Sequence, residues 1–217
     1  MNFSPLGRFD ANAPIAPSLL VAARAFAKSL PHLPDGSFFE RGYLHWTVAA
    51  FGCLFCDYDA EADYEHGVWT LRLPGNVLGN ARGERATESA HTWHRNAHAF
   101  GIALAGMDGA TETNFGNHGV TLAGIDMMLA GAAAVSIAYG IDATGTVDGY
   151  DAYSNPVIEP TWMTHAEAAV VDKYYGERWD FATLVALPPG TSLAELYAKT
   201  VGDAFRARIH AIKVALA

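Results

Sequence analysis

Two histidines and one aspartate in this sequence have the chemistry of zinc ligands. His45 lies in the segment LHWT, His165 lies in the segment THAE, and Asp180 follows in the segment RWD. A catalytic zinc ion takes three protein ligands and keeps one position for water. It lowers the pKa of that water and polarises a carbonyl group, so an amide can be hydrolysed without a covalent intermediate. No HExxH-type spacing is present, so only the fold could bring His45 and His165 together.

Asp172 is an alternative third ligand. It lies about two helical turns after His165. From that position its side chain is less suited than that of Asp180 to reach a metal ion bound by His165. Glu167 has a structural explanation instead, because the segment THAE fits the capping box that begins a helix.

Four short motifs extend the pattern and follow one another in a fixed order. They are His45-Trp46-Thr47, then His91-Thr92 with Asn96 and Gly101-Ile102, then Thr164-His165-Ala166-Glu167, and finally Arg178-Trp179-Asp180. In this order they resemble the motifs of zinc-dependent N-acetylmuramoyl-L-alanine amidases, the type shared by phage endolysins and peptidoglycan recognition proteins. The resemblance spans residues 42–181.

The resemblance implies a role for each matched residue. His45, His165 and Asp180 would bind the zinc ion, and His91 and Asn96 match positions that line the substrate groove. Arg178 stands where the family has a lysine or arginine that stabilises the oxyanion of the tetrahedral intermediate, as a fixed charge can. The alternative is a surface arginine that pairs with a neighbouring acid.

The general base stays open. Some family members place a glutamate in the Gly-Ile strand, where this sequence has Ala103, and others use a tyrosine at the start of the second strand. Tyr64 and His66 are both close to that place, and either could assist proton transfer. Tyr64 is equally consistent with a packed loop aromatic. The sequence also departs from many relatives after Asp180, where Phe181 and Ala182 replace Pro-Gly.

The other histidines and the two cysteines receive no required role. Cys53 and Cys56 have the spacing of half a metal or redox site, but without a second pair and in a strand-like segment we expect buried thiols. His94, His98 and His118 could widen the polar rim of the substrate groove, but we expect solvated loop histidines; His32 and His210 have no required role.

Hydrophobic periodicity, caps and turn residues predict the elements that position these residues. We expect helices over 18–30 and from 122 to about 140, a helix that begins at His165, and a last helix that begins at Ser192. We expect strands over 43–56, 68–73 and 100–105 and a short strand before Thr164, with 57–65 as a surface loop or short helix.

Composition narrows the function further. The chain has 217 residues, 51% of them hydrophobic, and a formal net charge of −9, which disfavours binding to nucleic acid. The first 17 residues lack the apolar region of a signal peptide. Residues 122–141 are long enough to span a membrane, but Asp126 and Ser136 interrupt them, so we expect a buried helix. We therefore expect synthesis in the cytoplasm.

These observations together predict one α/β domain with a mixed central sheet flanked by helices, the amidase-like fold that the resemblance implies. Residues 1–35 would form an arm and helix packed on a catalytic domain at 36–217. The expected activity is hydrolysis of the amide between N-acetylmuramic acid and L-alanine in peptidoglycan, as in a phage lysin, a secreted antibacterial effector or a recycling enzyme. The alternatives are a non-catalytic peptidoglycan-binding protein of the same fold and a zinc peptidase that cuts the stem peptide.

Overall fold

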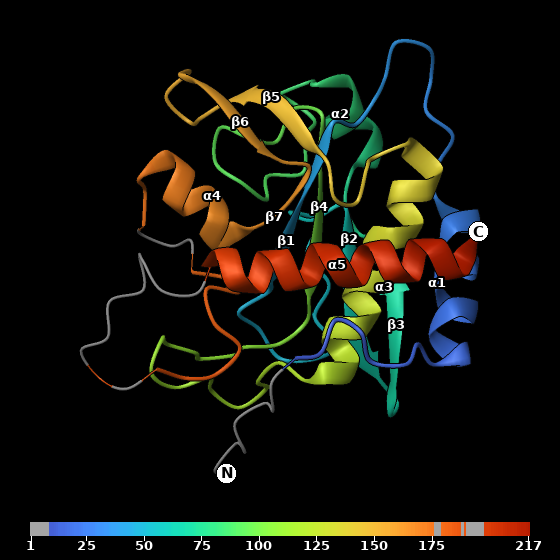
Figure 1. Ribbon diagram of the computed structural model, residues 1–217, viewed down its shortest axis with the longest axis vertical. Coiled ribbons are helices and arrows are strands. Elements are labelled where there is room, and N and C mark those ends of the chain that lie inside the picture. The colour runs from blue at the N-terminus through green and yellow to red at the C-terminus, as the bar shows by residue number, and fades with distance from the viewer. Residues whose placement is uncertain (1–8, 176–178, 188, 190–197) are drawn as a thin grey trace.

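A mixed β-sheet lies at the centre of the protein (Figure 1). The structure is a computed structural model, and it describes residues 9–175, 179–187, 189 and 198–217. Within these residues the sheet has five strands in the order β3 (Val68–Arg72), β2 (Ala60–Glu65), β4 (Ala99–Leu104), β1 (Arg41–Trp46) and β7 (Trp162–Thr164). β1 runs parallel to β4 and β7, and β2 runs parallel to β4 but antiparallel to β3. The predicted α/β class with a mixed central sheet flanked by helices is confirmed.

Three helices cover one face of this sheet. They are α1 (Pro17–Ser29), α3 (Leu122–Tyr139) and α5 (Ala198–Leu216), and α5 crosses the front of the molecule in Figure 1. Alternate residues of the strands, such as Leu44 and Trp46 of β1 and Ile102 of β4, point into the same core as these helices. Because side chains alternate along a strand, the residues between them must face the other side of the sheet.

α3 is a core helix, as its sequence predicts. Among the described residues it is the one helix long and apolar enough to cross a membrane by length and composition, but 61% of it is buried inside the protein. Ile125, Leu129 and Val135 have no exposed surface. Thr121 caps the first turn by accepting the Gly124 amide, and Gly140 ends the helix in the left-handed conformation.

The second face of the sheet is polar and carries the predicted metal ligand of β1. The register aligns His45 with Ala103 of β4, and Ala103 with Glu61 of β2, so these three side chains share this face. Gly101, also on β4, contributes no side chain. The loop over residues 83–98 packs here, and its His91 ring occupies the space where a β-carbon at position 101 would lie.

The segment 57–65 is mostly strand β2, so the prediction of a surface loop or short helix there is wrong. Asp59, Glu61 and Asp63 have no exposed surface. Each carboxylate accepts a backbone N–H group, from Gly101 at 2.8 Å, from Phe55 at 3.1 Å and from Gly52 at 2.8 Å respectively. These hydrogen bonds offset only part of the cost of burying the acidic groups, because the second oxygen of each carboxylate is buried without a hydrogen-bond partner among the described residues. The alternating alanines of the strand join the core.

β1 ends at Trp46, ten residues before the end of the predicted strand at Cys56. Gly52 adopts a left-handed φ of 83° in the loop that follows, and its backbone amide turns inward to Asp63. With the loop backbone facing the sheet, Cys53 and Cys56 are exposed free thiols. The prediction of buried thiols is therefore wrong.

The remaining elements complete the polar side. α2 (Val77–Arg82) precedes the 83–98 loop, and β5 (Thr146–Tyr150) and β6 (Pro156–Pro160) form a separate antiparallel hairpin. α4 (His165–Asp172) begins with the predicted capping box. β7 confirms the predicted short strand before Thr164. β3 and β4 confirm the strands predicted over 68–73 and 100–105, to within one residue at each end. The predicted helix start at Ser192 lies outside the described residues.

Stability should depend on pH through Glu61. Burial raises the pKa of this carboxyl from its ordinary 4.5 to about 7, against the opposing hydrogen bond from Phe55, and the charge of Asp63 adds to the rise. Between these values the folded protein binds a proton that the unfolded chain has released. The free energy of unfolding therefore falls as the pH rises through this window.

Glu61→Gln keeps an oxygen to accept the Phe55 amide but cannot ionise. Between about pH 5 and about pH 8 we expect the metal-free variant to lose less unfolding free energy than wild type, by roughly 1–3 kcal/mol. Urea denaturation at both pH values measures this difference. Equal losses in the two proteins would contradict the raised pKa.

Candidate metal centre and adjoining pocket

His45, His165 and Asp180 converge on one point. Nδ1 of His45 lies 3.3 Å from Oδ2 of Asp180, and Nδ1 of His165 lies 3.0 Å from the same oxygen. The ligand atoms of the three residues all lie within 4.8 Å of one another. His45 and Asp180 are buried, whereas His165 is partly exposed.

The donor set fits a zinc ion. Two imidazole nitrogens and one carboxylate oxygen are ligands that zinc prefers, and a set of three protein ligands is typical of catalytic sites. Burial acts to raise the pKa of Asp180, but His165 and then His45 outweigh it and lower the pKa below its ordinary value. Asp180 is therefore a carboxylate at neutral pH, as a metal ligand must be.

Strand register brings the two histidines together. Leu44 of β1 pairs directly with Thr164 of β7. His45 follows Leu44 and His165 follows Thr164, so the two histidines lie side by side. The capping box then fixes the first turn of α4, because Thr164 and Glu167 exchange hydrogen bonds between side chain and backbone. Arg206 of α5 holds Glu167 from the other side at 2.8 Å.

Asp180 is held by both backbone and packing. Its carbonyl accepts the amide of Ala166 in the first turn of α4, at 3.2 Å. The next residue, Phe181, adopts a left-handed φ of 59° and is fully buried. Its ring packs against Trp46 and Phe205, with centroid separations of 4.9 and 5.1 Å. The aspartate is therefore anchored to α4, β1 and α5 at once.

Asp172, the alternative ligand, belongs to a different cluster. Its carboxylate forms a bidentate pair with Arg95, with nitrogen–oxygen distances of 2.5–3.0 Å. Arg95 also donates to Glu159 of β6 at 2.6 Å and to the Tyr43 hydroxyl at 3.1 Å. This buried ion-pair cluster fastens the 83–98 loop to α4, β1 and the β5–β6 hairpin, and the ligand set that the structure assembles contains Asp180 instead.

Tyr64 and His66 lie elsewhere. By register Tyr64 is three residues beyond Glu61, which places it about 10 Å further along the strand and on the opposite face of the sheet. Its ring packs against Phe51 and Trp69, at 5.4 and 5.1 Å. His66 is exposed in the turn between β2 and β3. Arg178 lies outside the described residues.

Tyr58 is the tyrosine that the fold places beside the metal ligands, and the sequence-based interpretation missed it. Its ring centroid lies 5.3 Å from that of His45, and its hydroxyl donates to the Trp46 carbonyl at 3.3 Å. Burial and the nearby carboxylates of Asp180, Asp57 and Glu61 raise its pKa. Acids alternate with alanines over 59–63, which is the period of a strand. This pattern indicates that β2 starts just after Tyr58, and it could have identified Tyr58 as the tyrosine at the start of the strand.

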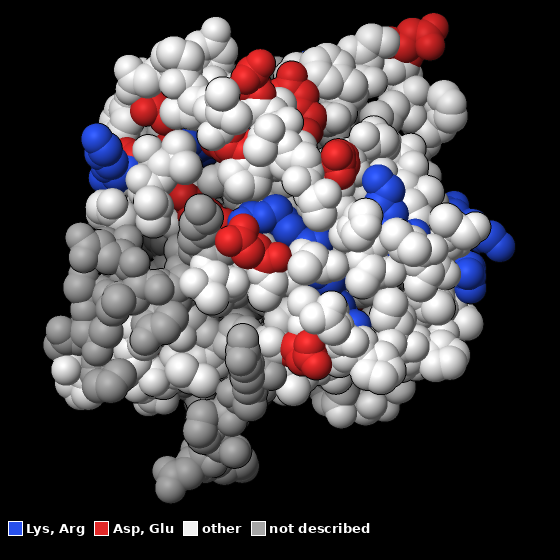
Figure 2. Space-filling view, in the orientation of Figure 1, with Lys and Arg blue, Asp and Glu red and all other residues white. Residues whose placement is uncertain are grey.

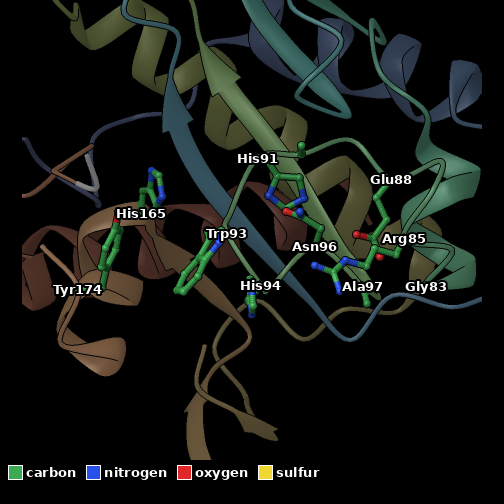
Figure 3. Close-up of a pocket in the computed structure, with 11 residues that line it drawn as sticks. Gly83, Arg85, Glu88, His91, Trp93, His94, Asn96, Ala97, His165 and Tyr174 are labelled. Atoms are coloured by element: carbon green, nitrogen blue, oxygen red, sulfur yellow. The ribbon is translucent and has the colours of Figure 1, made fainter. Parts of the chain in front are cut away.

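A pocket of about 710 Å³ opens beside His165 (Figure 3). Its lining includes Trp93 and Tyr174 near His165 and Arg85 and Glu88 at the far end. The Trp93 side chain is 47% exposed although the neighbouring Thr92 and Arg95 are buried. Trp93 and Tyr174 have ring centroids 5.5 Å apart and together form an aromatic wall.

His91 and Asn96, the predicted groove residues, both line this pocket. Asn96 is partly exposed, but His91 is only 5% exposed and its ring lies 5.5 Å from that of His45. Burial and the proximity of His45 and His165 lower the pKa of His91 well below its ordinary value, so this ring is neutral. His91 therefore belongs to the buried part of the pocket lining, with its ring close to that of His45.

Comparison with protein-family models, curated proteins and solved structures finds no match to this chain. The functional argument therefore depends on the geometry of the site itself.

The two aspartates offer a direct test of the ligand set. Asp180→Asn should weaken zinc binding by more than the roughly 10- to 100-fold that loss of an outer-shell partner costs. Asp172→Asn should weaken zinc binding far less than Asp180→Asn, but it should lower the free energy of unfolding by about 3–5 kcal/mol, because it leaves Arg95 with an incomplete buried partner. Competition with a chelator and urea denaturation measure the two effects, and an exchange of the two phenotypes would assign the metal to Asp172.

Proposed function

We propose that this protein is a zinc-dependent amidase that hydrolyses the bond between N-acetylmuramic acid and L-alanine in peptidoglycan. The observation that carries the proposal is the convergence of His45, His165 and Asp180 beside an open pocket. The order of the surrounding motifs, which resembles that of the amidase family, supports the choice of substrate.

The protein residues define where zinc would bind and from which side substrate would approach. His45, His165 and Asp180 would hold the ion, which when bound supplies a Lewis acid that lowers the pKa of water and polarises a carbonyl. His165 is the ligand that borders the pocket, whereas the other two are buried. We therefore place the scissile carbonyl on the His165 side of the centre.

Tyr58 is suited to stabilise charge on the substrate. Its hydroxyl is protonated at neutral pH and donates to the Trp46 carbonyl, and its ring centroid lies 5.3 Å from that of His45. Redirected to the scissile carbonyl, this hydrogen bond would strengthen as the oxygen gains negative charge, which is the property that accelerates amide hydrolysis.

The pocket suits a substrate with both sugar and peptide parts. Its volume lies within the roughly 300–1,000 Å³ typical of small-molecule sites. The aromatic wall of Trp93 and Tyr174 offers flat apolar surface for the face of a pyranose ring, while His94 and Asn96 offer polar groups for hydroxyl and acetamido substituents.

The molecular surface gives little electrostatic help in reaching the cell wall. The net charge is −9, and on the α5 face in Figure 2 the described Lys and Arg side chains lie in small separate groups. Long-range attraction to an anionic polymer is therefore weak. Affinity for peptidoglycan must come from contacts inside the pocket.

Zinc content and peptidoglycan digestion test the proposal together. Wild-type protein with stoichiometric zinc should release stem peptides that begin with a free L-alanine, as identified by mass spectrometry. His165→Ala should lose both zinc and activity, while His210→Ala, which changes an exposed histidine of α5, should retain both.

Other outcomes point elsewhere. Full activity in His165→Ala would refute the proposed function. Fragments cut within the stem peptide would identify a peptidase, and zinc binding without any released fragment would favour a binding protein.

Tyr58→Phe tests the role of the phenol hydroxyl. We expect kcat on a soluble muropeptide to fall by about 10²–10³-fold, the usual cost of one oxyanion donor, with zinc affinity unchanged. Tyr64→Phe is the matched control and should behave as wild type. A loss of kcat in Tyr64→Phe but not in Tyr58→Phe would instead support Tyr64, one of the two residues that the sequence suggests for proton transfer.

A further inference from the structure

A chain of polar contacts runs behind His45, on the side away from the other two ligands. Nε2 of His45 lies 3.2 Å from Oγ1 of Thr92, which lies 3.1 Å from Nδ1 of His91. Nε2 of His91 lies 3.4 Å from the carbonyl of Ala99 and 3.8 Å from the carboxylate of Asp59. Every side chain in this chain is at least nine-tenths buried.

The hydrogen atoms can be arranged in one consistent direction. A neutral histidine that presents Nδ1 to a metal carries its proton on Nε2, so His45 donates to the Thr92 hydroxyl. That hydroxyl can then donate to Nδ1 of His91, whose own proton lies on Nε2 and faces the Ala99 carbonyl.

Asn80 does not reverse this direction, although its amide nitrogen lies 3.4 Å from Nε2 of His91. The two amide hydrogens of Asn80 have better acceptors, because the carbonyls of Ser89 and Asn96 each lie 3.1 Å from the same nitrogen. Nε2 of His91 is therefore left to act as a donor.

The loop around Thr92 is held firmly enough to place the hydroxyl. Oδ1 of Asn96 accepts the Thr92 amide at 2.7 Å, and Arg95 is fixed by the buried ion-pair cluster with Asp172 and Glu159. Gly101 makes room for the His91 ring, since a β-carbon there would overlap it.

We propose that Thr92 and His91 are positioning residues that hold His45 in the tautomer and orientation that present Nδ1 to the metal. The inference rests on the metal site of the proposed function and not on the reaction that the site performs. It gives His91, and Asn96 through its hydrogen bond to the Thr92 amide, a role in supporting His45, in addition to their place in the pocket lining. Outer-shell partners of this kind orient metal-binding histidines and raise their basicity.

The test compares two substitutions at Thr92 in the full chain. Thr92→Val keeps the shape but removes the hydroxyl, and we expect zinc affinity to fall by about 10- to 100-fold. Thr92→Ser keeps the hydroxyl and should stay within about 3-fold of wild type. Thr87→Val, which changes an exposed threonine of the same loop, is the control and should leave the affinity unchanged. Competition with a chromophoric chelator measures affinity without any assay of activity.

A second readout is the tautomer of His45. In the zinc-loaded wild type, nitrogen NMR should show a proton on Nε2 of this ring, and in Thr92→Val that proton should exchange faster with solvent. Thermal melting of the metal-free variants checks that each one folds.

Wild-type affinity in Thr92→Val overturns the inference, and so does an equal loss in Thr92→Ser, which would assign the effect to packing. A wild-type protein that binds zinc yet releases no stem peptide refutes the proposed function but leaves this inference intact.

Discussion

The parallel pairing of β1 with β7 is the constraint on which the candidate metal centre depends. It joins segments more than one hundred residues apart and sets His45 beside His165 through the pair Leu44 and Thr164. The core enforces this register, because slipping β1 by one residue would move Leu44 and Trp46 out of the helix-covered face. The same apolar packing that stabilises the sheet therefore directs His45 to the polar face.

Buried charged groups organise the polar face, beside the short helices α2 and α4. Arg95 bridges Asp172 and Glu159, and the acids of β2 accept backbone amides from neighbouring segments. Removing one partner of such a buried group is costly, so these contacts select one geometry. In this protein the selected geometry holds the 83–98 loop against the sheet, where the loop contacts the candidate ligand His45 and lines the pocket.

Local sequence patterns predicted the elements whose signals are short-range. The periodicity of α1 and α3, the capping box of α4 and the strands β3 and β4 all depend on neighbours within a few residues. The failures share one cause. The pattern of residues 57–65 is typical of an exposed acidic segment. The acids are buried because they accept hydrogen bonds from distant backbone amides, which no local pattern connects to them. These donors are Gly101 to Asp59, Phe55 to Glu61 and Gly52 to Asp63. Because local patterns do not locate the start of β2, they indicate Tyr64 and not Tyr58 as the tyrosine at that place.

Residue types and their order carry the chemistry of the candidate site: two histidines and an acid, on segments whose type was mostly predictable. Tertiary structure decided which of those residues meet. It chose Asp180 over Asp172 because Arg95 engages Asp172, and it turned His91 toward His45 because Gly101 leaves space for the ring. Composition and spacing describe a chain in one dimension. Metal binding and buried hydrogen bonds require atoms a few ångströms apart, and only the folded sheet brings these residues so close together.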